Sequence, residues 1–159
     1  MDRSPAIGAR QNTVREVSET VVPLSDSINV RSASPEDVSA LQEFLRPFVV
    51  GEFILPRSDE DLLTLIQHGF VAEFDGEILG FAAIEIYSKK LAEVQSLAVA
   101  QAVQGRGVGS RLVEHCVDRA KALGVLEVMA ITASEDLFRK VGFDYSLPNQ
   151  KRALFVQVP

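Results

Sequence analysis

The feature that most restricts the fold of this chain is a glycine-rich segment between a strand pattern and a helix pattern. Residues 91–99 read LAEVQSLAV, typical of a strand, and residues 104–109 read QGRGVG, with three alternating glycines around one arginine. Apolar residues then recur on one face of a helix expected at about 107–123. The first N–H groups of a helix have no partner within it, and glycine lets a ligand approach the backbone. The segment therefore predicts an anion-binding site.

The spacing of these glycines argues against two common nucleotide-binding motifs. The dinucleotide fingerprint G-x-G-x-x-G needs its third glycine one residue later, and the phosphate loop G-x-x-x-x-G-K-[ST] needs a lysine that this segment lacks. A turn that only joins strand to helix is the plain alternative, although such a turn does not require three glycines. Arg106 favours a phosphate ligand, because a guanidinium group matches the geometry of phosphate oxygens.

The rest of the pattern predicts a single α/β (α+β) domain over residues 28–159. A polar stretch, residues 1–27, precedes it and is expected to be a flexible extension or else an arm that docks on a partner. The expected elements are a strand from 28, helices at 34–46 and 58–68, a hairpin at 70–88 turning at Asp75-Gly76, a strand at 91–99, a helix at 107–123, a strand at 125–131, a short helix at 135–141 and a strand at 153–158. This order predicts a mixed central sheet of about six to seven strands flanked by about four helices. We expect Pro47 to end the first helix, and residues 125–131 to form a central strand buried on both faces.

Composition narrows the function classes. The formal net charge of −6 over 159 residues argues against nucleic-acid binding through a basic face. The one cysteine, Cys116, allows no internal disulfide and is expected to be a buried packing residue, and there is no Cys/His spacing for a metal. No apolar run approaches the length of a membrane span, and no signal-peptide core is present. We expect a cytoplasmic protein that binds no membrane, no nucleic acid and no metal.

Residues 104–109 resemble the Q/R-x-x-G-x-G/A motif of the GCN5-related N-acetyltransferases (GNAT). The similarity extends over about residues 28–158 and includes the order of elements and the later LFRKVGF. It implies the GNAT fold and acetyl-CoA as co-substrate. In such proteins the backbone of the strand before the motif pairs with the pantetheine arm, and the motif seats the pyrophosphate. The resemblance thus implies a cofactor site made by Leu97, Ala98, Val99, Gln104, Gly105, Arg106, Gly107, Val108 and Gly109. A main-chain N–H at about Val99 would point at the thioester oxygen.

The resemblance also implies how protons are moved. Glu93 stands four residues before Leu97, where a glutamate of the family can accept a proton from the amine; a solvent-facing carboxylate is the alternative. The family's usual acid is a tyrosine, and Phe138 occupies its position here. Tyr145 is the candidate substitute, against a purely structural aromatic, and solvent could also protonate the thiolate.

Within the family, ILPRS (54–58) and the stretches around residues 71–84 and 91–99 resemble the acetyltransferase domain of N-acetylglutamate synthase. That subgroup implies direct transfer in a ternary complex to the α-amine of a small acidic amino acid such as L-glutamate, as part of arginine biosynthesis. It implies a substrate carboxylate contact at Arg57, with Lys151 and Arg152 as candidates for a second. Glu85 departs from the pattern, because related enzymes often carry a basic residue there.

Three alternatives stay open at this point: a non-catalytic acyl-CoA sensor, an acetyltransferase for another small amine, and an acetyltransferase for a peptide. Phe138, in place of the family's tyrosine, is the feature that supports the sensor. The chain could also form a homodimer.

Overall fold

A computed structural model describes residues 25–149 and 153–158 of the chain. The strands are β1 (Asn29–Ser32), β2 (Gly69–Phe74), β3 (Glu77–Ile86), β4 (Leu91–Val99) and β5 (Glu127–Ala130). The α-helices are α1 (Val38–Val50), α2 (Asp59–Leu65), α3 (Val108–Ala122) and α4 (Glu135–Lys140). Short 3-10 turns lie at Ser25–Ser27, Pro35–Asp37, Ile66–His68 and Gln101–Val103. Residues 1–24 of the predicted extension lie outside the described part of the chain, and its last residues, Ser25–Ser27, form a 3-10 turn.

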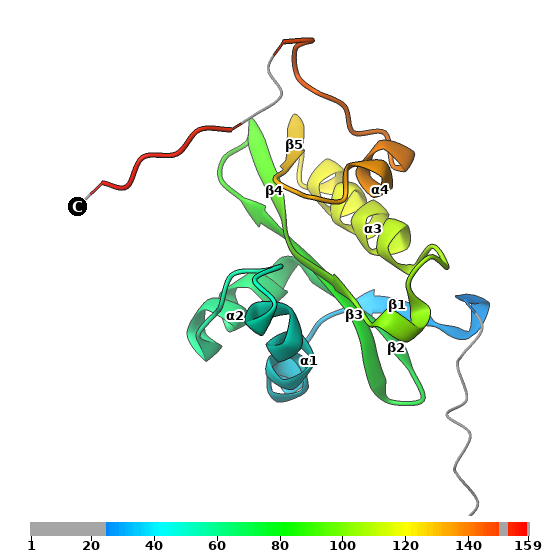
Figure 1. The fold of residues 1–159 in the computed structure, drawn as a ribbon. Coiled ribbons are helices and arrows are strands. Elements are labelled where there is room, and N and C mark those ends of the chain that lie inside the picture. Colours follow the sequence, from blue (N-terminus) through cyan, green and yellow to red (C-terminus); the bar gives the residue numbers. More distant parts are fainter. Residues whose placement is uncertain (1–24, 150–152, 159) are drawn as a thin grey trace, which may run out of the picture.

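The strands form one sheet in the order β1-β2-β3-β4-β5. Pairing is antiparallel from β1 to β4 and parallel between β4 and β5. In Figure 1, α1 and α2 lie on one side of this sheet, and α3 and α4 lie on the other. The mixed sheet and the four helices confirm the predicted fold, with slightly fewer strands than expected.

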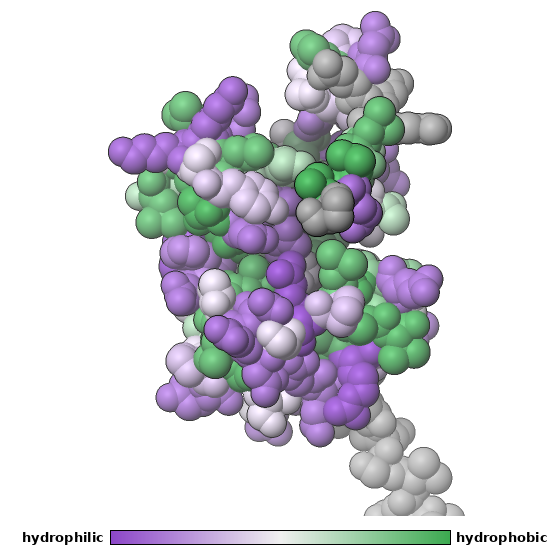
Figure 2. Space-filling view, turned by 90° about the vertical axis from the view of Figure 1, so that its left-hand side faces the viewer, coloured by the Kyte–Doolittle hydropathy of each residue, from purple (hydrophilic) through white to green (hydrophobic). Residues whose placement is uncertain are grey.

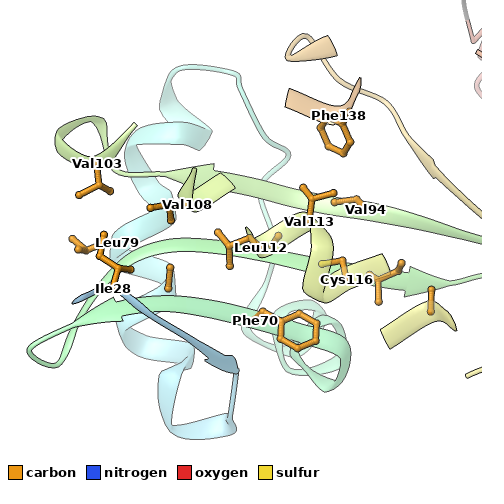
Figure 3. Packing of buried hydrophobic residues seen from close by; sticks show 14 of the residues in the cluster. Ile28, Phe70, Leu79, Val94, Val103, Val108, Leu112, Val113, Cys116 and Phe138 are labelled. Atoms are coloured by element: carbon orange, nitrogen blue, oxygen red, sulfur yellow. The ribbon is translucent and has the colours of Figure 1, made fainter. Parts of the chain in front are cut away.

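The two faces of the sheet carry separate cores, because successive side chains of a strand point to opposite sides. On one face, buried leucines of α1 and α2 pack on Val71, Phe81 and Ala83. On the other, the apolar face of α3 covers the sheet, and Figure 3 shows Leu112 and Cys116 near Val94 and Phe70. The buried position of Cys116 agrees with its predicted packing role.

Local signals placed most elements correctly. Ser58 caps α2: its hydroxyl accepts a hydrogen bond from the Asp61 N–H at 3.1 Å, and the Asp61 carboxylate accepts one from the Ser58 N–H at 3.3 Å. Asp75 and Gly76 turn the β2–β3 hairpin with φ of 51° and 77°, as a tight turn of this sequence requires.

Three expectations about elements were wrong. Pro47 lies inside α1, which continues to Val50, because so close to the helix end its missing N–H costs one bond while its φ suits a helix. The strand expected at 125–131 is the short β5, which lies at the end of the sheet and is only partly buried. The strand expected at 153–158 is absent; these residues are extended away from the sheet and exposed, since no neighbouring strand pairs with them.

No helix among the described residues is long and apolar enough to cross a membrane.

Candidate functional site

The site is organised by a break in the pairing of β4. Its partnership with β5 covers only four residue pairs, from Leu91↔Glu127 to Val94↔Ala130. Residues 95–99 continue the strand, but on that side no strand of the described chain pairs with them. Apart from the Val99 carbonyl, which accepts a hydrogen bond from Gln104, the backbone groups that point to that side are open to a ligand that hydrogen-bonds as a strand would.

A bulge in β4 lies at the start of this open edge. Phe81 of β3 pairs with Ala98 and Ala83 pairs with Gln95, so two residues of β4 stand opposite one residue of β3. Ser96 takes a φ of 55°, which is unusual for a residue with a side chain. Because of the extra residue, Gln95 and Ala98 both lie on the side of the sheet that carries α1 and α2.

The glycine segment leads from β4 into α3. Gly105 and Gly107 have φ of 72° and 81°, and a Cβ built on either would meet no atom within 4 Å. Gly107 is the residue from which α3 begins, and the side chain of Gln104 donates a hydrogen bond to the Val99 carbonyl at 2.9 Å. This bond fixes the loop to the end of β4, and Gly107, Gly109 and Ser110 at the start of α3 line a cleft.

Gly109 has a different role from the two preceding glycines. It is buried in the first turn of α3, and a Cβ there would lie 2.7 Å from Leu137 Cδ1 and 3.6 Å from Val99 Cγ2. The missing side chain lets α4 pack closely on the beginning of α3. Seven of the nine predicted cofactor residues line one cleft: Leu97, Ala98, Val99, Gln104, Gly105, Gly107 and Gly109. Val108 is instead buried in the core under α3, and Arg106 is not among the residues that line the cleft.

A cleft of about 1080 Å³ joins these features. Its walls are the open part of β4, the glycine segment with the start of α3, and the residues that connect β5 to α4 and continue into that helix. Phe48, Phe53 and Ile54 close it on the side of α1 and the α1–α2 connection. The cleft therefore runs from the start of α3, along the unpaired edge of β4, toward the sheet face that carries α1 and α2. A long ligand with a phosphate end and an extended amide-bearing arm fits this shape.

On the sheet face that carries α1 and α2, four side chains form a continuous chain of hydrogen bonds. Arg57 Nη2 donates to Gln95 Oε1 at 3.0 Å, Gln95 Nε2 donates to the Tyr87 hydroxyl at 3.3 Å, and Tyr87 donates to Glu93 Oε2 at 2.5 Å. Glu93 is buried, with 8% of its surface exposed, whereas half of Tyr87 is exposed. Burial and the hydrogen bond to Glu93 raise the pKa of Tyr87 to about 12, so its hydroxyl remains a donor at neutral pH.

The backbone of Arg57 is fixed by a hydrogen bond, whereas its guanidinium group has only part of its hydrogen bonds satisfied. Gln42 of α1 donates to the Arg57 carbonyl at 3.1 Å and to Asp59 at 2.9 Å, which ties the residue to the start of α2. Its Nε is buried and has no hydrogen-bond partner among the described residues. A buried guanidinium nitrogen without an acceptor is costly, and an incoming carboxylate would satisfy it.

Tyr87 and Gln95 were not found from the sequence. Gln95 lies two residues from Glu93 and thus on the same side of the strand, which was an available signal. Tyr87 lies just beyond β3 in the connection to β4, and the pairing of Glu85 with Glu93 brings it near. Its contact with Glu93 depends on the path of this connection, for which the sequence gives no periodic signal.

The remaining predicted residues lie elsewhere. Tyr145 does not line the cleft; its hydroxyl donates to Glu135 at 2.6 Å in a hollow on the outer side of β5, and Glu135 borders both. Phe138, in place of the family's tyrosine, is buried against Phe143 with ring centroids 5.1 Å apart. Lys151 and Arg152 lie outside the described residues. The role of Tyr145 as acid stays a prediction.

Two other routes of chemistry find no support in the site. Burial raises the pKa of the Cys116 thiol to about 12, which keeps it protonated and unreactive in the core. Within residues 25–149 and 153–158, no group of three or more His, Cys, Asp or Glu side chains is arranged to hold a metal ion.

Comparison with known proteins gives a consistent match. Residues 38–143 match the model of the acetyltransferase (GNAT) family. An uncharacterized N-acetyltransferase of Chlorobaculum tepidum is 34% identical over 122 residues, which cover 77% of this chain and 78% of that protein. An amino-acid acetyltransferase of Ralstonia nicotianae is 33% identical over 142 residues, which cover 86% of this chain and 32% of that protein.

Among solved structures, the N-acetylglutamate synthase of Neisseria gonorrhoeae, complexed with coenzyme A and N-acetyl-glutamate, matches with a TM-score of 0.67 and 28% identity. The match covers 74% of this chain and 28% of that one. The chain thus spans about a third of the length of the amino-acid acetyltransferases that it resembles.

Proposed function

Because the chain belongs to the acetyltransferase (GNAT) family and is therefore an acetyl-CoA-dependent acyltransferase, we propose that its acceptor is the α-amine of a small acidic amino acid such as L-glutamate. Transfer is direct, with both substrates bound at once. The amino-acid acetyltransferases among its relatives support this acceptor, and so does the chemistry of the face that carries α1 and α2.

The observation that carries the proposal is the unsatisfied Nε of Arg57 at one end of a hydrogen-bond chain that has Glu93 at the other. An amino acid presents a carboxylate and an amine a short distance apart. Arg57 is suited to the carboxylate, because a guanidinium group binds carboxylate oxygens in pairs. Glu93 is suited to the amine, because it can accept the proton that the nitrogen loses.

The cleft supplies what the other substrate needs. The glycine segment and the start of α3 are suited to the pyrophosphate of acetyl-CoA, and the open edge of β4 is suited to its pantetheine arm. A new bond forms between the amine nitrogen and the acetyl carbon while the carbon–sulfur bond breaks, and Glu93 takes the proton of the amine. Backbone N–H groups of β4 stabilise the negative charge that develops on the thioester oxygen. The thiolate takes a proton from solvent, because Tyr145 does not line the cleft.

The test is thiol release from acetyl-CoA with the full chain and a panel of L-glutamate, L-aspartate, L-glutamine and L-lysine. We expect the highest kcat/KM with an acidic amino acid. Arg57→Ala should raise the KM of that substrate by about tenfold or more, since a hydrogen bond to a charged group is worth about 1.5–3 kcal/mol. Arg46→Ala, at an exposed position on α1, is the matched control and should not change it. Transfer that is equally fast to amines without a carboxylate would refute the proposal.

One observation favours a second acceptor class, a small amine that carries an additional positive charge. Glu85 pairs directly with Glu93 across β3 and β4. Two carboxylates therefore occupy neighbouring positions on the sheet face that carries α1 and α2, which we call the acceptor face. A second acidic group on the substrate would be repelled there. Higher activity with L-lysine than with L-glutamate would select this alternative, and Glu85 rather than Arg57 would then be the residue that determines the acceptor.

A further inference from the structure

Gln95 is the one side chain in the hydrogen-bond chain of the acceptor face that has no role in the transfer reaction so far. It lies on β4 two residues after Glu93 and directly before Ser96, the residue at which the strand bulges. The open edge of β4 follows the bulge. Gln95 therefore stands between the proposed proton acceptor and the backbone suited to the acyl donor, which is the part of the strand that the acceptor amine has to reach.

The direction of the hydrogen bonds through Gln95 is fixed by the chemistry of their two ends. Arg57 can only donate, so the atom of the Gln95 amide that lies 3.0 Å from Arg57 Nη2 must be the oxygen. The amide nitrogen then lies 3.3 Å from the Tyr87 hydroxyl and donates to it. The one hydrogen of that hydroxyl is left for Glu93. Every bond of the chain thus points from the guanidinium group toward the carboxylate.

Position 95 therefore requires a group that accepts a hydrogen bond at one end and donates one at the other, as an amide does. A carboxylate at this position would have no hydrogen for Tyr87 and would itself bind the Arg57 guanidinium group. An ammonium group would have no lone pair for Arg57. An apolar side chain would leave both neighbours without this partner.

The bond to Gln95 also determines how the Arg57 guanidinium group is turned. Gln95 binds Nη2, whereas the Arg57 Nε is buried and has no hydrogen-bond partner among the described residues. Because a guanidinium group is planar and its donors form a rigid fork, fixing Nη2 also fixes the direction of the Nε–H bond. The unsatisfied edge of the group, which can bind a carboxylate, is thereby held in one orientation.

The side of the molecule that carries α2 suits a charged acceptor. Arg57 directly precedes Ser58, the capping residue of α2, and is only partly buried. Figure 2 shows the molecule from the side on which α2 lies in Figure 1, and hydrophilic residues are exposed there among hydrophobic ones. A charged small molecule can approach over such a mixed surface without losing all of its hydration.

We propose that Gln95 is the positioning residue that makes the acceptor site specific for a carboxylate. It holds the Arg57 guanidinium group in the orientation that binds the carboxylate, and this role rests on the acceptor proposed above. Gln95 itself touches no reacting atom and acts through Arg57. Its loss weakens acceptor binding more than the transfer step, because Tyr87 can still donate to Glu93.

The values of KM and kcat for L-glutamate in two variants of the full chain test this role. Gln95→Leu removes both hydrogen bonds and should raise KM by about three- to tenfold while kcat stays within about twofold. Gln95→Glu keeps the size of the side chain but places a carboxylate against Arg57, so KM should rise further, by about tenfold or more. A residue that only fills space would give the reverse order, because a glutamate side chain has nearly the shape of glutamine. The reverse order would therefore overturn the proposal.

Two controls accompany these variants. Gln67→Glu makes the same change at an exposed position of the turn Ile66–His68 and should leave both constants unchanged. The affinity for acetyl-CoA, measured by calorimetry, should be the same in all the proteins, because Gln95 is not among the residues that line the cleft. Equal affinity shows that each variant is folded.

A double-mutant cycle with Arg57→Ala shows whether Gln95 acts through Arg57. If it does, Gln95→Leu should change KM by less than about twofold once the guanidinium group has been removed. Additive effects of the two substitutions would overturn the proposal. A wild type that transfers equally fast to amines without a carboxylate would instead refute the proposed acceptor, and the role of Gln95 with it. The wild type alone thus tells the two failures apart.

Discussion

Two regions of the molecule are suited to the proposed ligands through different parts of the chain. In the cleft, the features suited to acetyl-CoA belong to the backbone: the open edge of β4, the glycine loop and the first turn of α3. On the sheet face that carries α1 and α2, the features suited to the proposed acceptor are four side chains, Arg57, Tyr87, Glu93 and Gln95. A backbone site tolerates many substitutions as long as the path of the chain is kept, whereas a side-chain site can be changed by one. The acceptor is therefore the feature that can vary among proteins with this cleft.

The largest expected effect is the loss of activity on substitution of Glu93, which should leave the binding of acetyl-CoA in the cleft unchanged. Glu93→Gln removes the proton acceptor but keeps the size of the side chain, so kcat should fall by about 10²–10⁴-fold. Binding of acetyl-CoA, measured by calorimetry, should be unchanged because the cleft is lined by other residues. A variant that turns over at a near-normal rate would show that Glu93 is only a buried structural carboxylate.

The next effect concerns the stability of the fold at low pH, through the ion pairs of Arg31 with Asp37 and Glu73. The Arg31 guanidinium lowers the pKa of Asp37 to about 2, from an ordinary value of 3.8. Asp37 lies at the start of α1, and Arg31 also binds Glu73 at 2.7 Å. Because the folded-state pKa is depressed, this stability is present above about pH 4 and is lost as the pH falls toward 2.

The size of this effect is about 2 kcal/mol, from 1.36 kcal/mol for each pH unit of the shift. Asp37→Asn should lose it at neutral pH and show a flatter dependence of unfolding free energy on pH between about 2 and 5. Urea titrations at several pH values measure this difference. Parallel curves for the two proteins would contradict the assignment.

A smaller effect tests the backbone site. Gly107→Ala forces a residue with a side chain into a φ of 81°, at a cost of about 1–2 kcal/mol. The loop should relax, and the affinity for acetyl-CoA should fall by about tenfold, since 1.4 kcal/mol is a factor of ten. Gly76→Ala is the matched control, because its φ of 77° carries the same strain in the β2–β3 turn. Equal affinity of both variants would mean that the path of the glycine loop does not matter for binding.

The smallest effect concerns Tyr87. Tyr87→Phe removes two hydrogen bonds, the one that Tyr87 donates to Glu93 and the one that it accepts from Gln95. It should lower kcat by about three- to tenfold, the factor that corresponds to a net loss of about 1 kcal/mol. Because the pKa of Tyr87 is about 12, its hydroxyl stays protonated in the assay range. The ratio of wild-type to variant rates should therefore be constant between about pH 7 and 10. A ratio that falls toward unity over this range would mean that the hydroxyl ionises there.

Sequence patterns predicted the backbone site better than the side-chain site. Residues 104–109 could be identified because their function needs glycine at fixed spacing, and the capping residue Ser58 could be identified for a similar local reason. Glu93 and Arg57 were suggested by a family resemblance. Tyr87 was missed because its contacts depend on the path of the connection from β3 to β4, whereas Gln95 was missed although its place two residues from Glu93 was an available signal.

The errors in the fold have a related cause. The pattern at 125–131 has the composition of a buried strand, but its neighbours in space decide how much of it is covered. The pattern at 153–158 is that of a strand as well, yet a strand exists only when another one pairs with it. Periodicity indicates which secondary structure a segment can form, but it does not indicate which other strand the segment will pair with.

The bulged strand β4 has a consequence for the timing of the reaction. Glu93 precedes the bulge and the open edge follows it, so one continuous strand carries both the proposed proton acceptor and the backbone suited to the acyl donor. Their separation is therefore set by the covalent path of a single strand and its bulge. Enzymes that hold two reactants on separate domains must wait for a closing motion in every cycle. Here both parts belong to one strand, so the proposed alignment of the two reactants needs no closing motion between domains.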